Sequence, residues 1–330
     1  MFNYEKLTQD LFNELPIRKR QVLEKRFGIE GGEPLTLQAI GDQIGITRER
    51  VRQIENDALA YIKETQTQKL QKPFEYFMDH LTNYGGLREE GMLLKELGQD
   101  KFQNHVLLLL TIGDPFFKIK ESNDFLSFWT TEAKIEAEAR KILKTVIKEF
   151  KNTQSPLPVK DLEKKMPFNL KIPVLVSFID VSKFIFESPF GDYGMVDWPE
   201  IRPKGLKDQA YLVLKRHDKP MHFRDIAKGI EGLPFVDKKI LPESVHNELI
   251  RNKRFVLIGR GLYALTEWGY KPGTVKDILK GLLKQSKPGL TKEHLIEKVL
   301  EQRNVKESTI VLNLQDKKIF KREKGAYTLK

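Results

Sequence analysis

The strongest constraint on the fold lies in residues 15–63, where two apolar patterns of helical spacing are separated by a glycine. The apolar residues are Leu37, Ile40 and Ile44 before Gly45, and Val51 and Ile54 after it. Because the spacing within each group is helical and the break is short, the pattern predicts two short helices that meet at a tight turn. Two helices joined in this way form a helix-turn-helix.

Small and polar residues stand where such a pair of helices needs them. Gly41 precedes Gly45 by one helical turn, where the two helices cross closely and a side chain would push them apart. Thr36 and Thr47 occupy the expected N-cap positions, and Glu49 in the first turn of the second helix suits the helix dipole. We therefore expect the second helix to begin near residue 48.

The second helix is predicted to turn a row of polar side chains outward: Arg48, Glu49, Arg50, Arg52 and Gln53. In a recognition helix, these first turns enter the major groove. Arg can bond guanine bidentately, Glu can accept from cytosine N4, and Gln can pair with adenine. The alternative is a solvated helix face without a ligand, because polar residues are usually exposed.

The segments LPIRKRQVLEKRFG (15–28) and TLQAIGDQIGITRERVRQIE (36–55) resemble region 4 of the sigma-70 family of bacterial transcription initiation factors. The resemblance implies base contacts to the upstream promoter hexamer by Arg48, Glu49 and Gln53, and phosphate contacts by Thr36, Thr47, Arg50 and Arg52. It also implies docking on the flap of RNA polymerase. Family members usually continue with several basic residues, whereas residues 56–62 read NDALAYI. This departure predicts a weaker phosphate clamp and favours the docking role.

Charge is distributed unevenly along the 330 residues, whose formal net charge is +11. Residues 203–330 hold 28 Lys+Arg and 15 Asp+Glu, whereas the first 202 residues hold 29 and 31. A basic C-terminal part on a near-neutral remainder suggests a polyanionic partner such as double-stranded DNA, because neutralised phosphates release counterions. The alternative is a lysine-rich surface that serves solubility.

The composition also limits the chemistry and the location of the protein. The chain has no cysteine, which excludes disulfides and thiolate sites. No apolar run approaches the length of a membrane span, and the N-terminus has no signal core, so we expect no membrane partner and a cytoplasmic, nucleoid-associated protein.

Beyond residue 72 the sequence repeats with a period marked by Trp129, Trp198 and Trp268, which are 69 and 70 residues apart. Each tryptophan closes a similar octet, and GAYTLK (325–330) fits a fourth copy. A β-prone run and a turn precede each octet and predict a β-hairpin that follows helices, as in a winged helix. We therefore predict a mainly α fold with small β-hairpin wings. The predicted domains are a helix-turn-helix domain (1–72) and four winged-helix units, named segment 1 (73–131), segment 2 (132–202), segment 3 (203–270) and segment 4 (271–330).

Segment 3 carries KPMHFRDIAKGI and ILPESVHNELIRNKRFVLIGRGLYALTEWGY, which resemble the HARE-type winged helix. This domain type is also found in the delta subunit of some bacterial RNA polymerases. The other segments are assigned by internal similarity alone.

The four segments differ in the residues that they offer for binding. In segments 1 and 2 the predicted third helices, 104–112 and 172–181, are largely apolar and the hairpin turns are acidic, so we expect these helices to pack against neighbours. Segments 3 and 4 offer basic residues that could contact phosphates. The candidates are Arg251, Lys253, Arg254 and Arg260, accompanied by His246, Asn247 and Asn252, in segment 3, and Lys317, Lys318, Lys321, Arg322 and Lys324 in segment 4.

The sequence offers little for catalysis. The six histidines are scattered without zinc-ligand spacing, and no glycine pair is followed by the Lys-Ser/Thr of a phosphate-binding loop. Asp161, Glu163 and Lys165 resemble a nuclease pattern but fall on one short predicted helix. We therefore expect no cofactor, no metal and no enzymatic activity.

The leading hypothesis is a monomeric, sequence-specific DNA-binding protein of bacterial transcription. It would be an accessory regulator and not a full sigma factor, because no segment resembles the part of that family that melts promoters. Two alternatives stay open: a protein-interaction scaffold that docks on RNA polymerase, and the DNA-recognition chain of a restriction or repair system.

Overall fold

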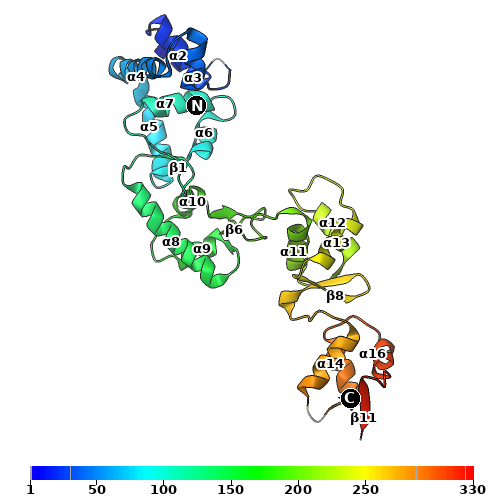
Figure 1. Ribbon diagram of the computed structural model, residues 1–330. Coiled ribbons are helices and arrows are strands. Elements are labelled where there is room, and N and C mark those ends of the chain that lie inside the picture. Colours follow the sequence, from blue (N-terminus) through cyan, green and yellow to red (C-terminus); the bar gives the residue numbers. More distant parts are fainter. Residues whose placement is uncertain (1, 30, 287–288, 324) are drawn as a thin grey trace. The chain divides into compact units, whose positions relative to one another are not determined.

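The computed structural model describes residues 2–29, 31–286, 289–323 and 325–330. Within these ranges the chain is mainly helical with small β-hairpin wings, as the sequence predicted, and each hairpin is part of a small antiparallel sheet (Figure 1). The chain divides into two compact units, an N-terminal unit of residues 1–196 and a C-terminal unit of residues 197–330. No helix in the described ranges is long and apolar enough to span a membrane.

The first five helices follow one another closely: α1 (Tyr4–Phe12), α2 (Ile17–Phe27), α3 (Leu37–Ile44), α4 (Arg48–Thr65) and α5 (Thr67–Asn83). Helix α5 runs through Pro73, so the domain boundary predicted after residue 72 falls inside this helix. Proline inside a helix costs about 3 kcal/mol through its missing N–H and its clash with the preceding turn. Here Leu70, Pro73, Phe77 and Leu81 form one buried face of α5, and burial of this face offsets the cost.

Segment 1 continues with α6 (Glu90–Gly98) and α7 (Gln103–Ile112), and most residues of α7 are buried. Its buried residues are His105, Val106, Leu108, Leu109, Leu110 and Ile112. A helix that is apolar all round belongs in a core. The packing predicted for this third helix is confirmed, and the neighbour is the helix-turn-helix itself. One hydrophobic cluster joins α7 to Leu23 and Phe27 of α2 and to Ala58 and Ile62 of α4.

The remaining helices are α8 (Ile135–Thr153), α9 (Val159–Lys165) and α10 (Ile172–Asp180) in segment 2, α11 (Gly205–His217), α12 (Phe223–Glu231) and α13 (Pro242–Arg251) in segment 3, and α14 (Val275–Gln285), α15 (Lys292–Leu300) and α16 (Glu307–Leu314) in segment 4. A 3₁₀ turn, η1 (Thr266–Trp268), ends segment 3. In both compact units, most helices bury an apolar face and expose a polar one.

Each sheet has three strands, and the last strand in sequence lies in the middle. The strands are β1 (Leu87–Glu89), β2 (Phe117–Ile119), β3 (Phe128–Thr130), β4 (Leu157–Pro158), β5 (Ile185–Glu187), β6 (Asp192–Met195), β7 (Met221–His222), β8 (Phe255–Gly259), β9 (Leu262–Leu265), β10 (Leu290–Thr291), β11 (Phe320–Glu323) and β12 (Ala326–Leu329). A hairpin therefore lies at each of the four places where the repeat pattern predicted one. The domain boundaries assigned to these repeats stay a prediction.

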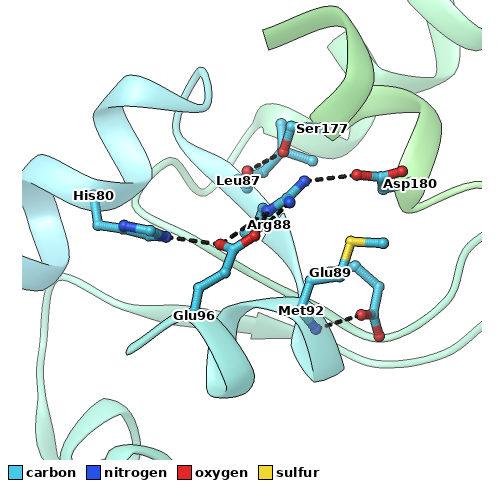
Figure 2. A network of polar contacts seen from close by, with 8 residues as sticks. All are labelled: His80, Leu87, Arg88, Glu89, Met92, Glu96, Ser177 and Asp180. Carbon is cyan, nitrogen blue, oxygen red and sulfur yellow. Dashed lines mark hydrogen bonds and ion pairs between the residues drawn. The ribbon is translucent and has the colours of Figure 1, made fainter. Parts of the chain in front are cut away.

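A buried arginine joins segments 1 and 2 within the N-terminal unit (Figure 2). Arg88 on β1, whose side chain is 9% exposed, donates to Glu96 Oε1 at 2.5 Å and to Asp180 Oδ2 at 2.6 Å. His80 Nε2 lies 2.8 Å from the other oxygen of Glu96. Although burial raises the pKa of Glu96, hydrogen bonds from His80 and Arg88 hold it at about 2. Burial raises the pKa of Asp180 to about 6 in spite of the neighbouring guanidinium.

The same joint buries the third helix of segment 2, as predicted for this largely apolar helix. Ser177 of α10 donates its hydroxyl to the carbonyl of Leu87 at 2.5 Å, and the Leu126 amide donates to the Val181 carbonyl at 2.9 Å. A Cβ on Gly85 would approach Val174 Cγ1 to 2.5 Å, which requires glycine at this contact. Helix α10 therefore packs on β1 as part of the interior of the N-terminal unit.

Candidate nucleic-acid interface

Two capping threonines and two glycines fix the geometry of the helix-turn-helix. The hydroxyls of Thr36 and Thr47 accept hydrogen bonds, each of 3.2 Å, from backbone amides in the first turns of α3 and α4. Gly45 ends α3 with φ of 71°, a left-handed conformation that favours glycine. A Cβ on Gly41 would lie 2.5 Å from the carbonyl oxygen of Ile46, so the helices can cross this closely because the residue has no side chain. The predicted caps and turn are thereby confirmed.

The inner face of the motif has its own small core, which orients the outer face. Val22, Ile40, Val51 and Ile54 are buried together, with Ile54 6% exposed. Because Val51 and Ile54 point inward, the intervening positions of α4 point to solvent. All five residues predicted to face outward are exposed: Arg48, Glu49, Arg50, Arg52 and Gln53.

The beginnings of α3 and α4 border two open grooves. One groove is lined by Arg26, Thr36, Leu37, Gln38 and Arg48. The other is lined by Gln38, Thr47, Arg48, Glu49 and Arg52. The structure thus brings five of the seven predicted contact residues to the grooves, whereas Arg50 and Gln53 lie on the same helix outside these linings.

Two arginines on this face are hydrogen-bonded to the neighbouring side chains that would read bases. Arg52 donates to both carboxylate oxygens of Glu49, from Nε to Oε2 at 2.9 Å and from Nη2 to Oε1 at 2.6 Å. Arg50 donates from Nη1 to Gln53 Oε1 at 3.0 Å. The hydrogen bond from Arg52 lowers the pKa of Glu49, so its side chain is a carboxylate at neutral pH. Two of the residues predicted to contact phosphates, Arg50 and Arg52, are therefore paired with two of the residues predicted to read bases, Gln53 and Glu49.

Sequence reasoning missed Arg26 and Gln38 as groove residues. Arg26 on α2 donates to the Leu35 carbonyl and to Glu55, both at 3.1 Å, and so ties α2 to the start of α3 and to α4. Gln38 borders both grooves and donates to Asp42 at 2.7 Å. Gln38 follows a predicted N-cap and could have been found from that position, whereas no local pattern places Arg26 beside Thr36.

The opposite face of the helix-turn-helix is closed by segment 1. Beyond the shared core with α7, Asn104 donates to the Gly28 carbonyl at 3.2 Å, and Lys63 forms an ion pair with Asp114. Tyr4 on α1 donates its hydroxyl to the Leu97 carbonyl at 3.0 Å, and burial raises its pKa to about 12. The apolar side of the motif is therefore an internal contact of the N-terminal unit.

In segment 3 the predicted basic residues do not share one environment. Arg251, Lys253 and Arg260 are exposed. Arg254 instead donates to Asp208 on α11 at 2.6 Å, and its guanidinium lies 5.1 Å from the centre of the Tyr211 ring. Arg254 thus joins the start of β8 to α11.

The polar residues that accompany them in segment 3 are placed differently. His246 stacks on Phe223 with ring centres 4.6 Å apart, and the Asn252 side chain accepts a hydrogen bond from the Arg254 amide at 3.0 Å. Asn247 is exposed on α13. Of these three residues, Asn247 is thus the one that faces solvent freely.

In segment 4 the predicted cations gather around the hairpin. Lys317 and Lys318 are exposed between α16 and β11, and no ion pair of either is found among the described residues. On β11, Lys321 forms an ion pair with Glu323, and Arg322 lies over the Tyr327 ring at 5.6 Å. The remaining candidate, Lys324, lies outside the described residues.

The described residues contain no group of three His, Asp or Glu side chains arranged to hold a metal ion. Of the nuclease-like trio on α9, Asp161 pairs with Lys164, and Lys165 pairs with Glu149 of α8.

Comparison with known proteins assigns families to two parts of the chain. Residues 11–64 match the family "Sigma-70, region 4", and residues 205–268 match the HARE-HTH family, a helix-turn-helix domain named in part after ASXL and restriction endonuclease proteins. Among curated proteins, the RNA polymerase sigma factor sigB of Arabidopsis thaliana is 47% identical over 62 residues, which are 18% of this chain and 11% of that protein. The RNA polymerase principal sigma factor HrdD of Streptomyces griseus is 46% identical over 54 residues, which are 16% of each chain.

The matches cover small parts of both this chain and its relatives. The chain spans between about a tenth and a sixth of the length of these two sigma factors. Both matched domain types are helix-turn-helix domains that bind DNA, and neither type is enzymatic. The family matches and the geometry of α3 and α4 together support a DNA-binding helix-turn-helix protein.

Proposed function

We propose that this chain is a sequence-specific DNA-binding protein of bacterial transcription, an accessory regulator that resembles sigma factors in its N-terminal domain. Helix α4 enters the major groove, where Arg48, Glu49 and Gln53 read base edges. Phosphate contacts come from four further residues: Thr36, Thr47, Arg50 and Arg52. The protein acts as a monomer, since several linked modules on one chain raise the effective concentration of each at its site.

The observation that carries this proposal is the difference between the two faces of the helix-turn-helix. Its apolar face is covered by α7, whereas the face with three arginines of α4 is exposed. The hydroxyls of Thr36 and Thr47 accept hydrogen bonds from the backbone amides of Ala39 and Arg50. Each threonine keeps its own O–H proton, which it can donate to a phosphate oxygen. The exposed face therefore has the hydrogen-bond donors that contacts to duplex DNA require. The apolar face needs no further partner, because α7 covers it.

The second candidate function is docking on RNA polymerase, supported by the sigma-factor relatives and by the segment 56–62, which lacks basic residues. Such docking would have to use a surface other than the apolar face that α7 covers. The recognition chain of a restriction or repair system is supported by the family match of segment 3 alone. We therefore favour a DNA-binding regulator of transcription over both alternatives.

We call contact between DNA phosphates and the basic residues of a C-terminal segment the anchor, and this role fits segment 4 better than segment 3. The exposed side chains of α13 include the acidic Glu243 and the apolar Ile250, which is 63% exposed, and neither can donate to a phosphate. Arg254 already forms an ion pair with Asp208. Segment 4 instead exposes the adjacent Lys317 and Lys318 beside its hairpin. We expect these lysines and Arg322 to contact phosphates with little sequence preference.

The first test selects duplexes from a random-sequence library with the intact chain and then measures binding of the selected and random duplexes. The Arg48→Ala/Gln53→Ala variant should lose the preference for the selected duplex. Lys6→Ala/Gln9→Ala is the matched control, because it removes one cation and one glutamine from the exposed side of α1. The proposal fails if the intact chain binds no duplex or if both variants keep the same preference.

The anchor is tested with two matched variants that each remove three positive charges: Lys317→Gln/Lys318→Gln/Arg322→Gln and Arg251→Gln/Lys253→Gln/Arg260→Gln. Each lost phosphate contact should reduce the slope of log affinity against log salt by about 0.9. We expect a larger reduction for the segment 4 variant, on selected and random duplexes alike. The reverse order would place the anchor in segment 3.

A further inference from the structure

Glu49 and Arg52 form an ion pair on the face that we propose to contact DNA, and Arg48 and Gln53 have smaller effects on the same carboxylate. Both hydrogen bonds of the pair run between a carboxylate and a guanidinium one helical turn apart, at 2.6 and 2.9 Å. The two side chains remain well exposed, 59% for Glu49 and 51% for Arg52. Exposed ion pairs exchange readily with solvent and with other ions, so this pair can open when a better partner arrives.

A DNA duplex offers such partners to both members of the pair. A phosphate competes with the carboxylate for Arg52, and the N4 amino group of cytosine competes with the guanidinium for Glu49. If one member is taken, the other loses its partner. A carboxylate that is left beside phosphates without a donor is repelled by them, so release of Arg52 is favourable only where Glu49 finds a base donor.

We propose that Glu49 holds Arg52 back from the DNA backbone until a cytosine amino group takes the carboxylate. This inference rests on the proposed DNA-binding function and adds a specificity role to it. On a duplex without the donor, Arg52 stays with Glu49 and one phosphate contact is not made. On a duplex with the donor, the base contact and the phosphate contact form together. Glu49 therefore both recognises its base and weakens binding to other sequences.

The second pair on α4, Arg50 with Gln53, has a neutral acceptor in place of a carboxylate and can therefore be compared with the Glu49–Arg52 pair. Arg50 is held by the neutral amide of Gln53 through one hydrogen bond of 3.0 Å. Loss of that bond leaves no unpaired negative charge beside the phosphates. We therefore expect Arg50 to contact phosphates on any sequence, so that the coupling resides in the charged pair.

The test compares the salt dependence of DNA binding by four forms of the full chain: the wild type, Glu49→Gln, Glu49→Gln/Arg52→Gln, and Asp57→Asn. Asp57 is exposed on α4, farther along the helix than the two pairs, so its variant is matched to Glu49→Gln in the loss of one negative charge. The probes are a random-sequence duplex and a duplex selected with the wild type.

On the random duplex, Glu49→Gln should steepen the slope of log affinity against log salt by about 0.9, the value for one additional phosphate. Its affinity should therefore fall roughly threefold more than that of the wild type between about 50 and 200 mM salt. The double variant should return to the wild-type slope, and Asp57→Asn should leave it unchanged. The wild type should be steeper on the selected duplex than on the random one.

Two results would overturn the inference while the DNA-binding proposal stands. One is an unchanged slope for Glu49→Gln, and the other is an equal change for Asp57→Asn, which would show a simple effect of net charge. If the wild type binds neither duplex, the proposed function fails and this inference fails with it.

Discussion

Replacement of Arg88 by methionine tests whether the buried ionic network holds segment 2 onto segment 1. The substitution keeps an unbranched apolar stem of similar length and removes the hydrogen bonds to Glu96 and Asp180. The Asp180 side chain is 12% exposed, so water can replace little of what the guanidinium supplied.

The expected cost follows from the burial of the partners that remain. Removing one member of a buried ion pair leaves an uncompensated charge and typically costs about 3–5 kcal/mol. Glu96 is 27% exposed and keeps its contact with His80, so most of the cost should arise at Asp180. We expect the free energy of unfolding of the N-terminal unit to fall by about 3 kcal/mol at neutral pH.

The same network predicts how this cost depends on pH. The pKa of Asp180 in the folded wild type is about 6, above its ordinary value of 3.8, because of burial. Between these values the folded state binds more protons than the unfolded state, so the Asp180 contribution to stability decreases as pH rises from about 4 to 6. Without Arg88 this pKa should rise further. The Arg88→Met cost should therefore be larger at about pH 8 than at about pH 5.

The assay uses the full chain with Trp198→Phe and Trp268→Phe, so that fluorescence reports Trp129. Trp129 lies opposite Arg88 in the β1–β3 register and is 3% exposed, which makes it a local reporter of unfolding. Urea unfolding is measured for Arg88→Met and for Arg88→Met/Asp180→Asn. The second variant removes the unpaired carboxylate and should recover most of the loss.

The reasoning is refuted if Arg88→Met costs less than about 1 kcal/mol, the scale of an exposed ion pair. It is also refuted if the cost is the same at both pH values, or if Asp180→Asn recovers no stability. Either of these outcomes would mean that Asp180 is not the group that Arg88 compensates.

Three further predictions concern the N-terminal unit. Gly41→Ala places a Cβ 2.5 Å from the Ile46 carbonyl oxygen and should lower the free energy of unfolding in urea by about 1–3 kcal/mol. Its control is Gly281→Ala on α14, which should be neutral or stabilising because no atom lies within 4 Å of the new Cβ. Equal effects of the two variants would contradict the conclusion that α3 and α4 cross closely because Gly41 has no side chain. Thr47→Val removes the N-cap hydrogen bond of α4 and should cost about 1 kcal/mol, and an unchanged unfolding midpoint would show that the cap contributes nothing. Burial lowers the pKa of His105 below its ordinary 6.5, so the unfolded state binds the extra proton first and the N-terminal unit should lose stability as pH falls through about 6.5 and below. His105→Leu should flatten this part of the pH profile, and an unaltered profile would assign the pH dependence to other groups.

The candidate site illustrates what short-range sequence patterns can predict. The spacing of Ile40, Val51 and Ile54, with Thr36 and Thr47 as caps, was sufficient to predict the two helices, their turn and the outward face of α4. Each of these features depends on residues within a few positions of one another, where backbone hydrogen bonding and helical periodicity dominate. The largely apolar sequence of α7 likewise predicted that it packs inside the protein.

Contacts between distant residues were not predictable in this way. The continuation of α5 through Pro73 was not predictable, because the gain from packing one face of this helix does not appear in local helix propensity. Arg254 was predicted as a DNA contact from its charge alone, but in the folded chain it pairs with Asp208, and its contact with DNA stays untested. The charge of a side chain indicates which ligands it can bind, but the residues around it in the folded chain determine whether it is free to bind them.

The sequence by itself therefore determined the two helices of the helix-turn-helix, their polar face and the four hairpins, because these depend on periodicity, caps and turns. The tertiary structure decided which faces are available. It covered the apolar side of α2 and α4 with α7, placed Arg26 beside Thr36, and buried Arg88 between two carboxylates. These pairings join residues far apart in the chain, and they form because burial of apolar surface and compensation of buried charge are satisfied only when the whole unit is folded.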